Sequence, residues 1–397
     1  MGPVLIIDGS HWLYVYALTQ EPIYNVDFID ISITYYTLRK IYELILKYQP
    51  SEVHVVFDIG RDLKKKKKFE KYKSLRNIKS TIKGRSLDSM VHERIQFSRK
   101  LLHQILEPTP IHTYLIPFIE GDTIIAFIAK QHLKNDKLII SNDKDMYQLL
   151  DEKTKIVSKS PITKLEETLT HNNLDRVWGS IVGKELLLKK IIEETGNEPI
   201  SYKCIPYYRA FLGDVSDCIP GVKGVGPAII GYIIQYQQYT GKIEFTSPDD
   251  FFTWINTNLP EMESIHSNLT TLLYNKKKRN LNFAKFKEII NDPNTRNTWQ
   301  TFFELIDFDY AIGELSSSVY RTLLEELRTK KRYDEEEFLQ MIREYDLNST
   351  SSYIKWHTIN KILETNGDWS ILNKMSGIND IEVLFNSLCN RCALKEG

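Results

Sequence analysis

Eight acidic residues stand in four small groups along the chain, each where a strand is expected to end or a turn to begin. They are Asp8, Asp58, Glu120, Asp122, Asp143, Asp145, Asp214 and Asp217. If the strands are parallel neighbours, at least the first six carboxylates meet at one edge of the sheet, and so many negative charges require cations or protons. Carboxylate oxygens without cysteine or histidine partners suit Mg²⁺ or Mn²⁺ better than zinc. Two such ions about 3.5–4 Å apart can hold the attacking and leaving oxygens of a phosphodiester displacement.

Each aspartate taken alone has a simpler explanation as a helix cap or a turn residue. Loops that lead into helices commonly end in aspartate, and aspartate is frequent in turns. Only the joint occurrence of the eight residues favours a metal site. The four groups therefore form one hypothesis about one site.

The elements that must position these carboxylates follow from the hydrophobic pattern of the first half of the chain. Short β-branched runs alternate with helical patterns, which is typical of a parallel sheet with crossover helices. The predicted strands are 4–8, 52–58, 111–117 and 137–143. One predicted helix follows the first strand and ends near residue 46, and two others cover about 91–106 and 122–133. From about Ser158 helical patterns dominate, and Pro227 follows a glycine-rich turn at a predicted first helical position.

A basic segment directly follows the second predicted strand. Between Arg61 and Arg85 the chain has 12 Lys+Arg and two acids, although the whole chain has a formal net charge of zero. A lysine run is usually a solvated loop. Here Phe69, Tyr72 and Leu75 recur at helical spacing, which favours a helix or arch that grips the phosphates of a single strand.

Length and composition limit the class of protein. The chain has 397 residues, of which 42% are hydrophobic and 26% charged, and this is typical of a globular protein with two or three domains. The longest apolar runs are too short for a membrane span, and no signal peptide precedes the first strand, so we expect a cytoplasmic protein. The four cysteines fit a reducing compartment, and the single CxxC at Cys389 and Cys392 does not predict a zinc site.

Several motifs occur together in one order and spacing. They are IIDG at 6–9, VVFD at 55–58, KYKSLR at 71–76, IEGDTIIAFIA at 119–129, IISNDKDMYQLL at 139–150 and GDVSDCIPGVKGVGP at 213–227. In this combination the chain resembles the 5′-nuclease superfamily, in the branch of bacteriophage 5′→3′ exonucleases, flap endonucleases and phage-type RNase H. The resemblance covers about residues 4–240, and LIDFDYAI at 305–312 extends it weakly to about 345.

The resemblance implies roles for individual residues. The first metal site would be Asp8, Asp58, Glu120 and Asp122, and the second Asp143, Asp145, Asp214 and Asp217. Lys73 and Arg76 match basic residues that contact the scissile phosphate, so with Asp145 they are the expected catalytic residues. The expected nucleic-acid contacts are Lys65, Lys67, Lys71, Lys73 and Arg76 in the arch, and Gly221, Lys223, Gly224 and Gly226 in a helix–hairpin–helix turn whose backbone amides bind phosphate.

One motif departs from the family pattern. The family usually has Glu-Ala-Asp-Asp where this chain has Glu120, Gly121, Asp122 and Thr123. Thr123 keeps an oxygen but loses a negative charge. We expect weaker metal binding with retained activity, because the other carboxylates remain.

The predicted architecture is an α/β, PIN-like 5′-nuclease domain with a mostly parallel central sheet, followed by helical regions. The predicted segments are 1–180 for catalysis, with the arch at about 59–90, 181–290 for helix–hairpin–helix DNA binding, and 291–397 for a helical C-terminal region. The resemblance implies two Mg²⁺, replaceable by Mn²⁺, and a K⁺ ion at the turn. It also implies substrates with 5′ ends, 5′ flaps or RNA–DNA hybrids, in replication or repair.

Two alternatives remain open from the sequence. A non-catalytic junction-binding protein would follow if Thr123 impairs the metal site. A nuclease of the same fold specialised for RNA is the other. We further expect a monomer without membrane contact, whose region 346–397 docks a replication protein or caps the helical domain.

Overall fold

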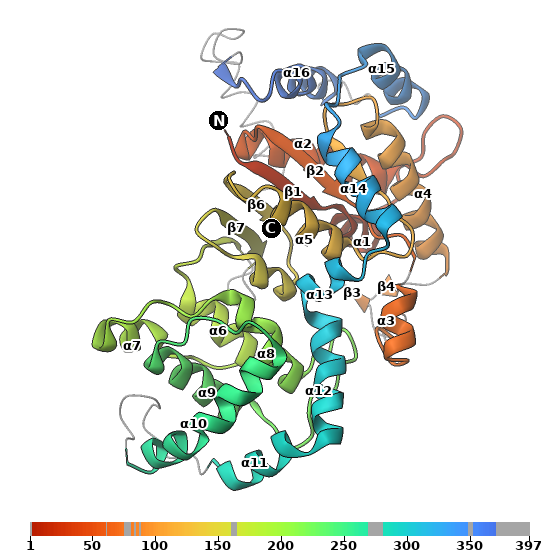
Figure 1. The fold of residues 1–397 in the computed structure, drawn as a ribbon. Coiled ribbons are helices and arrows are strands. Elements are labelled where there is room, and N and C mark those ends of the chain that lie inside the picture. Colours follow the sequence, from red (N-terminus) through yellow and green to blue (C-terminus); the bar gives the residue numbers. More distant parts are fainter. Residues whose placement is uncertain are drawn as a thin grey trace. The chain divides into compact units, whose positions relative to one another are not determined.

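The computed structural model describes residues 2–60, 62–74, 81–82, 85–86, 89–159, 165–268, 281–347 and 352–370 (Figure 1). The chain forms two compact units that interleave in sequence. Unit 1 comprises Met1–Gly60, Ser80–Ser141 and Ser316–Gly397, and unit 2 comprises Arg61–Lys79 and Asn142–Leu315. The three consecutive segments predicted above remain predictions, because compact units are defined by contacts and not by function.

Unit 1 contains four parallel strands in the order β5-β2-β1-β6. Their bounds are β1 Val4–Asp8, β2 Glu52–Val56, β5 His112–Tyr114 and β6 Lys137–Ile140, and a short antiparallel pair, β3 Thr81–Ile82 with β4 Arg85–Ser86, is separate. Val4 to Ile7 are buried on both faces, as expected for a strand inside a parallel sheet. Asp8 is in register with Val56, so the carboxyl ends of β1 and β2 lie at the same edge.

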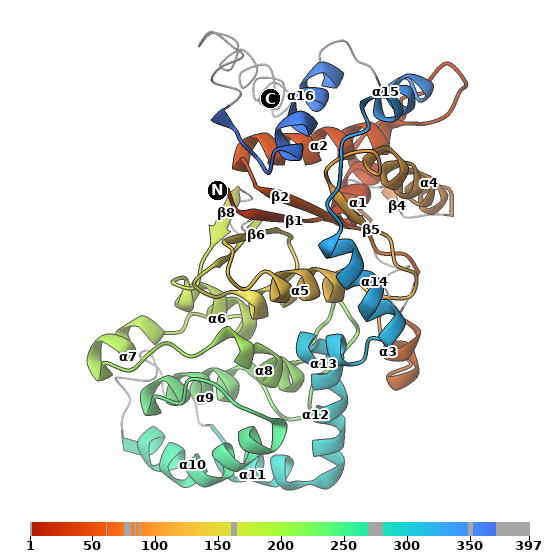
Figure 2. The same ribbon diagram turned by 45° about the horizontal axis from the view of Figure 1, so that its top comes forward.

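Helices cover both faces of this sheet (Figure 2). The helices of unit 1 are α1 Gly9–Thr19, α2 Ser32–Tyr48, α4 Ser89–Leu106, α5 Gly121–Gln131, α14 Ser317–Arg328, α15 Glu335–Glu344 and α16 Ser352–Glu364. In both views α1, α2 and α4 lie on one face and α5 lies on the other. Phe127 of α5 contacts Tyr320 of α14 edge to face, and Tyr42 of α2 stacks on Trp356 of α16, so the last described helices complete this unit.

Unit 2 is mostly helical. Its elements are α3 Leu63–Lys68, η1 Lys144–Leu149, β7 Thr154–Lys159, β8 Glu166–Leu169, α6 Leu174–Val182, α7 Leu188–Thr195, η2 Tyr202–Cys204, α8 Ile205–Leu212, α9 Pro227–Thr240, α10 Pro248–Asn268, α11 Phe283–Asn291, α12 Pro293–Ile306 and α13 Phe308–Gly313. No helix among the described residues is long and apolar enough to cross a membrane.

The structure confirms the four predicted strands and the α/β pattern, with two differences. Three of the strands end earlier than predicted, at Val56, Tyr114 and Ile140, so Asp58 and Asp143 lie in the loops that follow. Helices dominate after Ser158 as predicted, but the sequence analysis did not identify strand β8, which pairs antiparallel with β7. Three of the four β8 residues are exposed or half-buried, so the strand has no apolar run that the sequence could reveal.

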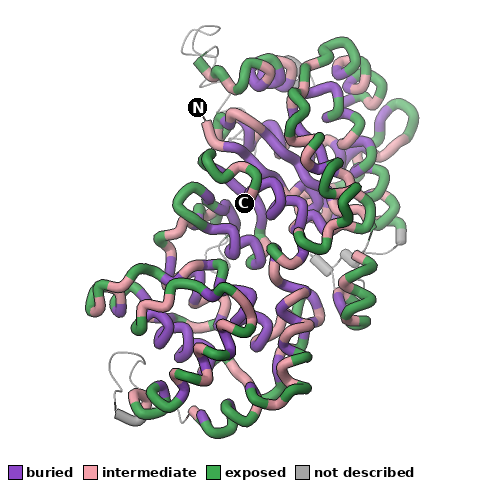
Figure 3. The backbone as a smooth tube through the Cα atoms, viewed as in Figure 1, coloured by how far each residue is buried: buried purple, intermediate pink, exposed green. Residues whose placement is uncertain are grey.

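The core of unit 2 is built from aromatic residues around Trp299 of α12. The indole stacks on Phe251 and Phe303 at ring-centroid distances of 5.6 and 5.2 Å, and its Nε1–H donates to the carbonyl of Tyr207 at 3.1 Å. Trp299 is fully buried, and Figure 3 shows that buried backbone runs through the interior of each unit. Aromatic pairs of this kind stabilise a core beyond their buried area.

Replacing Trp299 with alanine should lower the free energy of unfolding by about 3–5 kcal/mol, because it leaves a large cavity among aromatic rings. Urea unfolding followed by far-ultraviolet circular dichroism measures the change. The control is Met90→Ala, at a side chain of α4 that is 71% exposed, which should stay within about 0.5 kcal/mol. Equal losses in the two variants would contradict the aromatic core as the main stabilising cluster of unit 2.

Candidate active site

Asp8 ends β1 and caps α1. Its Oδ1 accepts a hydrogen bond from the His11 N–H at 3.0 Å, and its Oδ2 accepts one from the Ser141 hydroxyl at 3.2 Å. The capping bond is the ordinary role of an N-cap aspartate. The same geometry also holds the carboxylate at the carboxyl end of the sheet, where ligands of α/β folds bind.

Asp58 is fixed by the starts of two helices of unit 1. Its backbone N–H donates to the Ser10 hydroxyl at 2.7 Å, and its Oδ1 accepts from the Gly121 N–H at 2.5 Å. A Cβ added to Gly121 would lie 3.0 Å from that oxygen, which is tighter than most real contacts. The departure from the family's alanine at this position therefore matches a close approach of Asp58 to the helix backbone.

Glu120 and Asp122 belong to the start of α5. Glu120 is the N-cap residue and is buried, and Asp122 lies in the first turn, where the positive end of the helix dipole favours a carboxylate. Thr123 is only 2% exposed, and its N–H donates to the Glu120 carbonyl at 3.0 Å. A fifth carboxylate of this group, at position 123, would thus have to be buried, which costs free energy unless a cation pairs with it.

The second acidic group lies in unit 2. Asp143 caps η1, and its Oδ1 accepts a hydrogen bond from the Asp145 N–H at 2.9 Å. Burial and the neighbouring Asp217 raise the pKa of Asp143, although Arg209 and Lys73 oppose the shift. Part of this shift comes from repulsion between the carboxylates of Asp143 and Asp217, which a divalent cation would relieve.

Arg209 of α8 is a site residue that sequence reasoning missed. Its guanidinium forms ion pairs with both Asp145 and Asp214, and the residue is only 7% exposed. Burial raises the pKa of Asp214, but Arg209 and hydrogen bonds from Ser216 outweigh it and lower the pKa below the ordinary value. The sequence feature that could have identified it is a single arginine among apolar residues, five positions before Asp214. Helix α8 directs this arginine toward the acids.

The basic segment reaches the same group through Asp217. The Tyr72 hydroxyl donates to Asp217 Oδ2 at 3.1 Å, the Lys73 N–H donates to the Asp217 carbonyl at 2.9 Å, and Lys73 Nζ lies 3.6 Å from Oδ2. Lys73 adopts a positive φ of 51°. This backbone bend lets the main chain and the side chain of Lys73 contact one aspartate, so Lys73 lies beside Asp217, one of the predicted metal ligands.

The other predicted arch residues are placed less directly. Arg76 lies outside the described residues, so its predicted role stays a prediction. Lys67 and Lys71 are exposed, and Lys65 Nζ lies 5.6 Å from the centroid of the Tyr72 ring. The neighbouring Lys68 pairs with Glu304 and donates to the Tyr310 hydroxyl, so part of the lysine run holds α3 against α12 and α13.

The glycine-rich turn precedes α9 in unit 2. Gly221 and Gly224 have φ of 73° and 88°, and a Cβ on Gly221 would lie 2.6 Å from backbone atoms of α8. Gly226 differs, because it is the N-cap of α9 with φ −123°, a conformation open to any residue. Lys223 is exposed in the turn, and Pro227 begins the helix as predicted. The turn thus presents exposed backbone and one cation beside a helix N-terminus.

The chemistry of both groups suits hard divalent cations. Each group offers carboxylate oxygens and no sulfur, which is the donor set that Mg²⁺ and Mn²⁺ prefer. In unit 2 the cations of Arg209 and Lys73 already compensate the negative charge. The donor chemistry of these residues therefore suits a metal ion, and in unit 2 two basic side chains lie beside the carboxylates.

Among solved structures, those of a phage protein are similar to this chain. A crystal structure of the T5 D15 protein with metal ions has a TM-score of 0.48 and 19% identity, and covers 85% of this chain and 98% of that chain. The bacteriophage T5 D15 flap endonuclease in a complex with DNA and metal ions has a TM-score of 0.46 and 17% identity, over 86% and 99% of the two chains.

Comparison of sequences identifies relatives in bacteria. Residues 3–179 match the family described as "5′-3′ exonuclease, N-terminal resolvase-like domain". The 5′-3′ exonuclease of Aquifex aeolicus is 28% identical over 229 residues, covering 57% of this chain and 67% of that protein. The 5′-3′ exonuclease of Buchnera aphidicola subsp. Acyrthosiphon pisum is 30% identical over 228 residues, with the same coverage. The chain therefore belongs to the 5′-3′ exonuclease family of 5′ nucleases.

Proposed function

We propose that the protein hydrolyses phosphodiesters near 5′ ends or at 5′ flaps by a two-metal mechanism. The observation that carries the proposal is the second acidic group, in which Arg209 pairs with Asp145 and Asp214 while Lys73 lies beside Asp217. Partly buried carboxylates alternating with cations match a site that must bind both metal ions and phosphate. The products would carry a 5′-phosphate and a 3′-hydroxyl.

The eight acidic residues divide into two ligand sets in this proposal. The first ion would be held by Asp8, Asp58, Glu120 and Asp122, and the second by Asp143, Asp145, Asp214 and Asp217. When bound, two divalent ions, Mg²⁺ with Mn²⁺ as a substitute, supply an activated water and stabilise the charge of the leaving oxygen. The hydrogen bonds to Asp8, Asp58 and Asp143 fix these carboxylates before any ion arrives.

The basic residues have a second role in addition to charge compensation. Lys73 and Arg209 each lie beside a carboxylate, and either side chain would be available to a phosphate oxygen if its carboxylate were bound to a metal ion. Arginine presents a planar fork that matches two phosphate oxygens, and lysine a single point charge. Arg76, which the resemblance pairs with Lys73, would complete the phosphate contacts.

The proposed substrates are DNA with 5′ ends or flaps and RNA primers on DNA. Supporting this, the turn at 221–226 can bind backbone phosphates without reading base sequence, with a K⁺ ion on its carbonyls as an option. The exposed lysines of α3 suit a single strand. We also propose a monomer that acts in replication or repair, with replication proteins contacting the C-terminal region.

Cleavage of a 5′-labelled flap and of a matched RNA–DNA hybrid tests the function. We expect products at the junction or stepwise from the 5′ end with Mg²⁺ or Mn²⁺, and none with EDTA. Asp145→Asn should reduce turnover by at least about 10³-fold while flap binding in a gel shift is retained, because it removes a metal ligand and not a phosphate contact. Tight binding without cleavage by the parent protein in either metal would instead identify a junction-binding protein.

Arg209→Gln should destabilise the metal-free protein by about 3 kcal/mol, because it leaves two carboxylates without their buried partner. Mg²⁺ should restore more stability in this variant than in the parent, since the ion replaces the lost positive charge. Urea unfolding in EDTA and in Mg²⁺ gives both values. The control is Arg176→Gln, whose guanidinium pairs with the half-buried Glu167 at 3.3 Å. An equal Mg²⁺ effect in all three proteins would contradict the assigned role of Arg209.

Lys223→Ala should weaken duplex binding and lower the slope of log affinity against log salt by about one charge. Turnover of a bound flap should change little, because Lys223 lies in the turn and not among the acids. Titrations at several salt concentrations measure the slope, with the exposed Lys203→Ala as the matched control. An unchanged slope for Lys223→Ala would remove the turn from the DNA-binding surface.

A further inference from the structure

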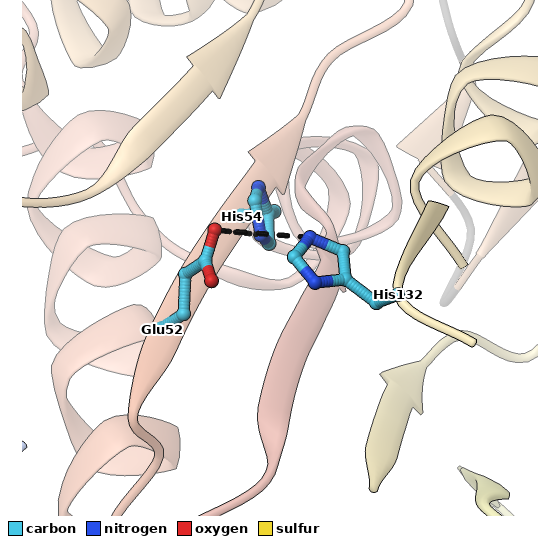
Figure 4. Close-up of side chains that lie close together, drawn as sticks. All are labelled: Glu52, His54 and His132. Carbon is cyan, nitrogen blue, oxygen red and sulfur yellow. Dashed lines mark ion pairs between the residues drawn. The ribbon is translucent and has the colours of Figure 1, made fainter. Parts of the chain in front are cut away.

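Three of the nine histidines of the chain gather around one glutamate in unit 1, away from the proposed active-site acids. Glu52 and His54 lie on β2, His112 on β5, and His132 caps the end of α5. We call these four residues the histidine cluster. Among the described residues, Glu52, His54 and His132 are the one group whose metal-binding atoms all lie within 4.8 Å of one another (Figure 4).

The distances within the histidine cluster are close to those between the ligands of a bound metal ion. Glu52 Oε1 lies 3.0 Å from His54 Nε2 and 3.7 Å from Nε2 of both His112 and His132. Ligand atoms of a tetrahedral zinc ion with bonds of about 2.0–2.1 Å are separated by about 3.3 Å. The separations from Glu52 bracket this value, and the metal-binding atoms of Glu52, His54 and His132 all lie within 4.8 Å of one another.

The Nε2 atoms of His54 and His132 both face Glu52. Within the described part of the chain, the buried Nε2 atom of His132 has no hydrogen-bond partner, and Nε2 of His54 lies 3.0 Å from Glu52 Oε1. His54 is fully buried and has its other nitrogen, Nδ1, 3.0 Å from the Tyr114 hydroxyl. If Nδ1–H donates to that hydroxyl, the lone pair of Nε2 faces the other ligands, which is the arrangement typical of metal-bound histidine.

A second layer of residues orients the ligands. His112 Nδ1 lies 3.4 Å from Glu326 Oε1 on α14, and Lys331 pairs with the same carboxylate at 2.9 Å. The His54 and His112 rings stack at a centroid distance of 4.9 Å, so their planes are fixed relative to one another. Carboxylates that hold the outer nitrogen of a histidine are common around zinc.

The histidine cluster and Asp58 lie at opposite ends of β2. Glu52 begins the strand and Asp58 follows its end, a separation of six residues or about 20 Å in extended chain. Imidazole with one carboxylate suits zinc, whereas the acidic groups suit magnesium. The two kinds of site therefore differ in both place and chemistry.

We propose that the histidine cluster binds one structural zinc ion that ties β2 and β5 to the end of α5. The ligands are Glu52 Oε1 and Nε2 of His54 and His132, and His112 supplies the fourth. Through Glu326 the ion also stabilises the position of α14. Loss of the ion should loosen this end of the sheet without removing any residue assigned to phosphodiester hydrolysis.

Zinc content of the full-length protein tests the proposal. Protein stripped with EDTA is given Zn²⁺ in excess Mg²⁺, desalted and analysed for zinc, and Co²⁺ is used separately because its visible absorption is strong in tetrahedral nitrogen sites and weak in octahedral oxygen sites. We expect one zinc per chain and a tetrahedral cobalt spectrum. No retained zinc, or only the weak spectrum, would show a polar network that binds no metal at this site.

Variants separate this site from the acidic groups. Glu52→Gln and His132→Ala should weaken zinc binding at least about 10-fold, whereas Asp145→Asn and His92→Ala, a change at an exposed histidine of α4, should not. Loss of zinc in Asp145→Asn alone would assign the ion to the acids and overturn the proposal. His132→Asn provides a variant whose folding can be checked by circular dichroism. If its spectrum is native, the variant should lose the zinc-dependent rise in melting temperature that the parent shows. A rise that persists in this variant would also overturn the proposal.

Discussion

Partly buried carboxylates that must remain ionised are the constraint on which much of this protein depends. In unit 2 the constraint is met by Arg209, which pairs with Asp145 and Asp214, and by Lys73, which lies beside Asp217. A protein that merely needed stability could replace such groups with apolar residues at little cost. The presence of these carboxylates beside basic residues is therefore in keeping with the proposed binding site for charged groups.

Rigid backbone surrounds these charges and limits what may occupy each position. Gly213 and Gly221 both have positive φ, and a Cβ on either would lie within 2.6 Å of backbone atoms. Gly121 approaches Asp58 almost as closely. The glycines in the motifs around the acids are therefore partly steric requirements. They permit backbone segments and carboxylates to approach one another closely, and the aspartates accept hydrogen bonds from backbone amides at these places.

Sequence reasoning could use only the signals that are encoded locally. Strand ends followed by acids, and a glycine-rich turn followed by proline, are readable because each signal occupies a few adjacent residues. Arg209 was missed because its partners are distant in sequence or one and a half helical turns away, and only the fold of α8 brings them together. The histidine cluster was missed for the same reason, since Glu52, His112 and His132 come from three separate elements. Strand β8 was not predicted, because a strand at the edge of a sheet does not need a run of apolar residues.

The interleaving of the two units has a consequence for synthesis on the ribosome. The chain passes between units at Gly60, Lys79, Ser141 and Leu315, so all of unit 2 is made before α14 to α16 of unit 1 exist. Until those helices emerge, the Phe127 face of α5 lacks Tyr320, and the Tyr42 hydroxyl lacks Asn360, its partner at 2.9 Å. Apolar surface of the nascent unit 1 therefore stays uncovered while the 174 residues from Asn142 to Leu315 are synthesised. That interval is the period in which a chaperone or early self-association would act on this chain.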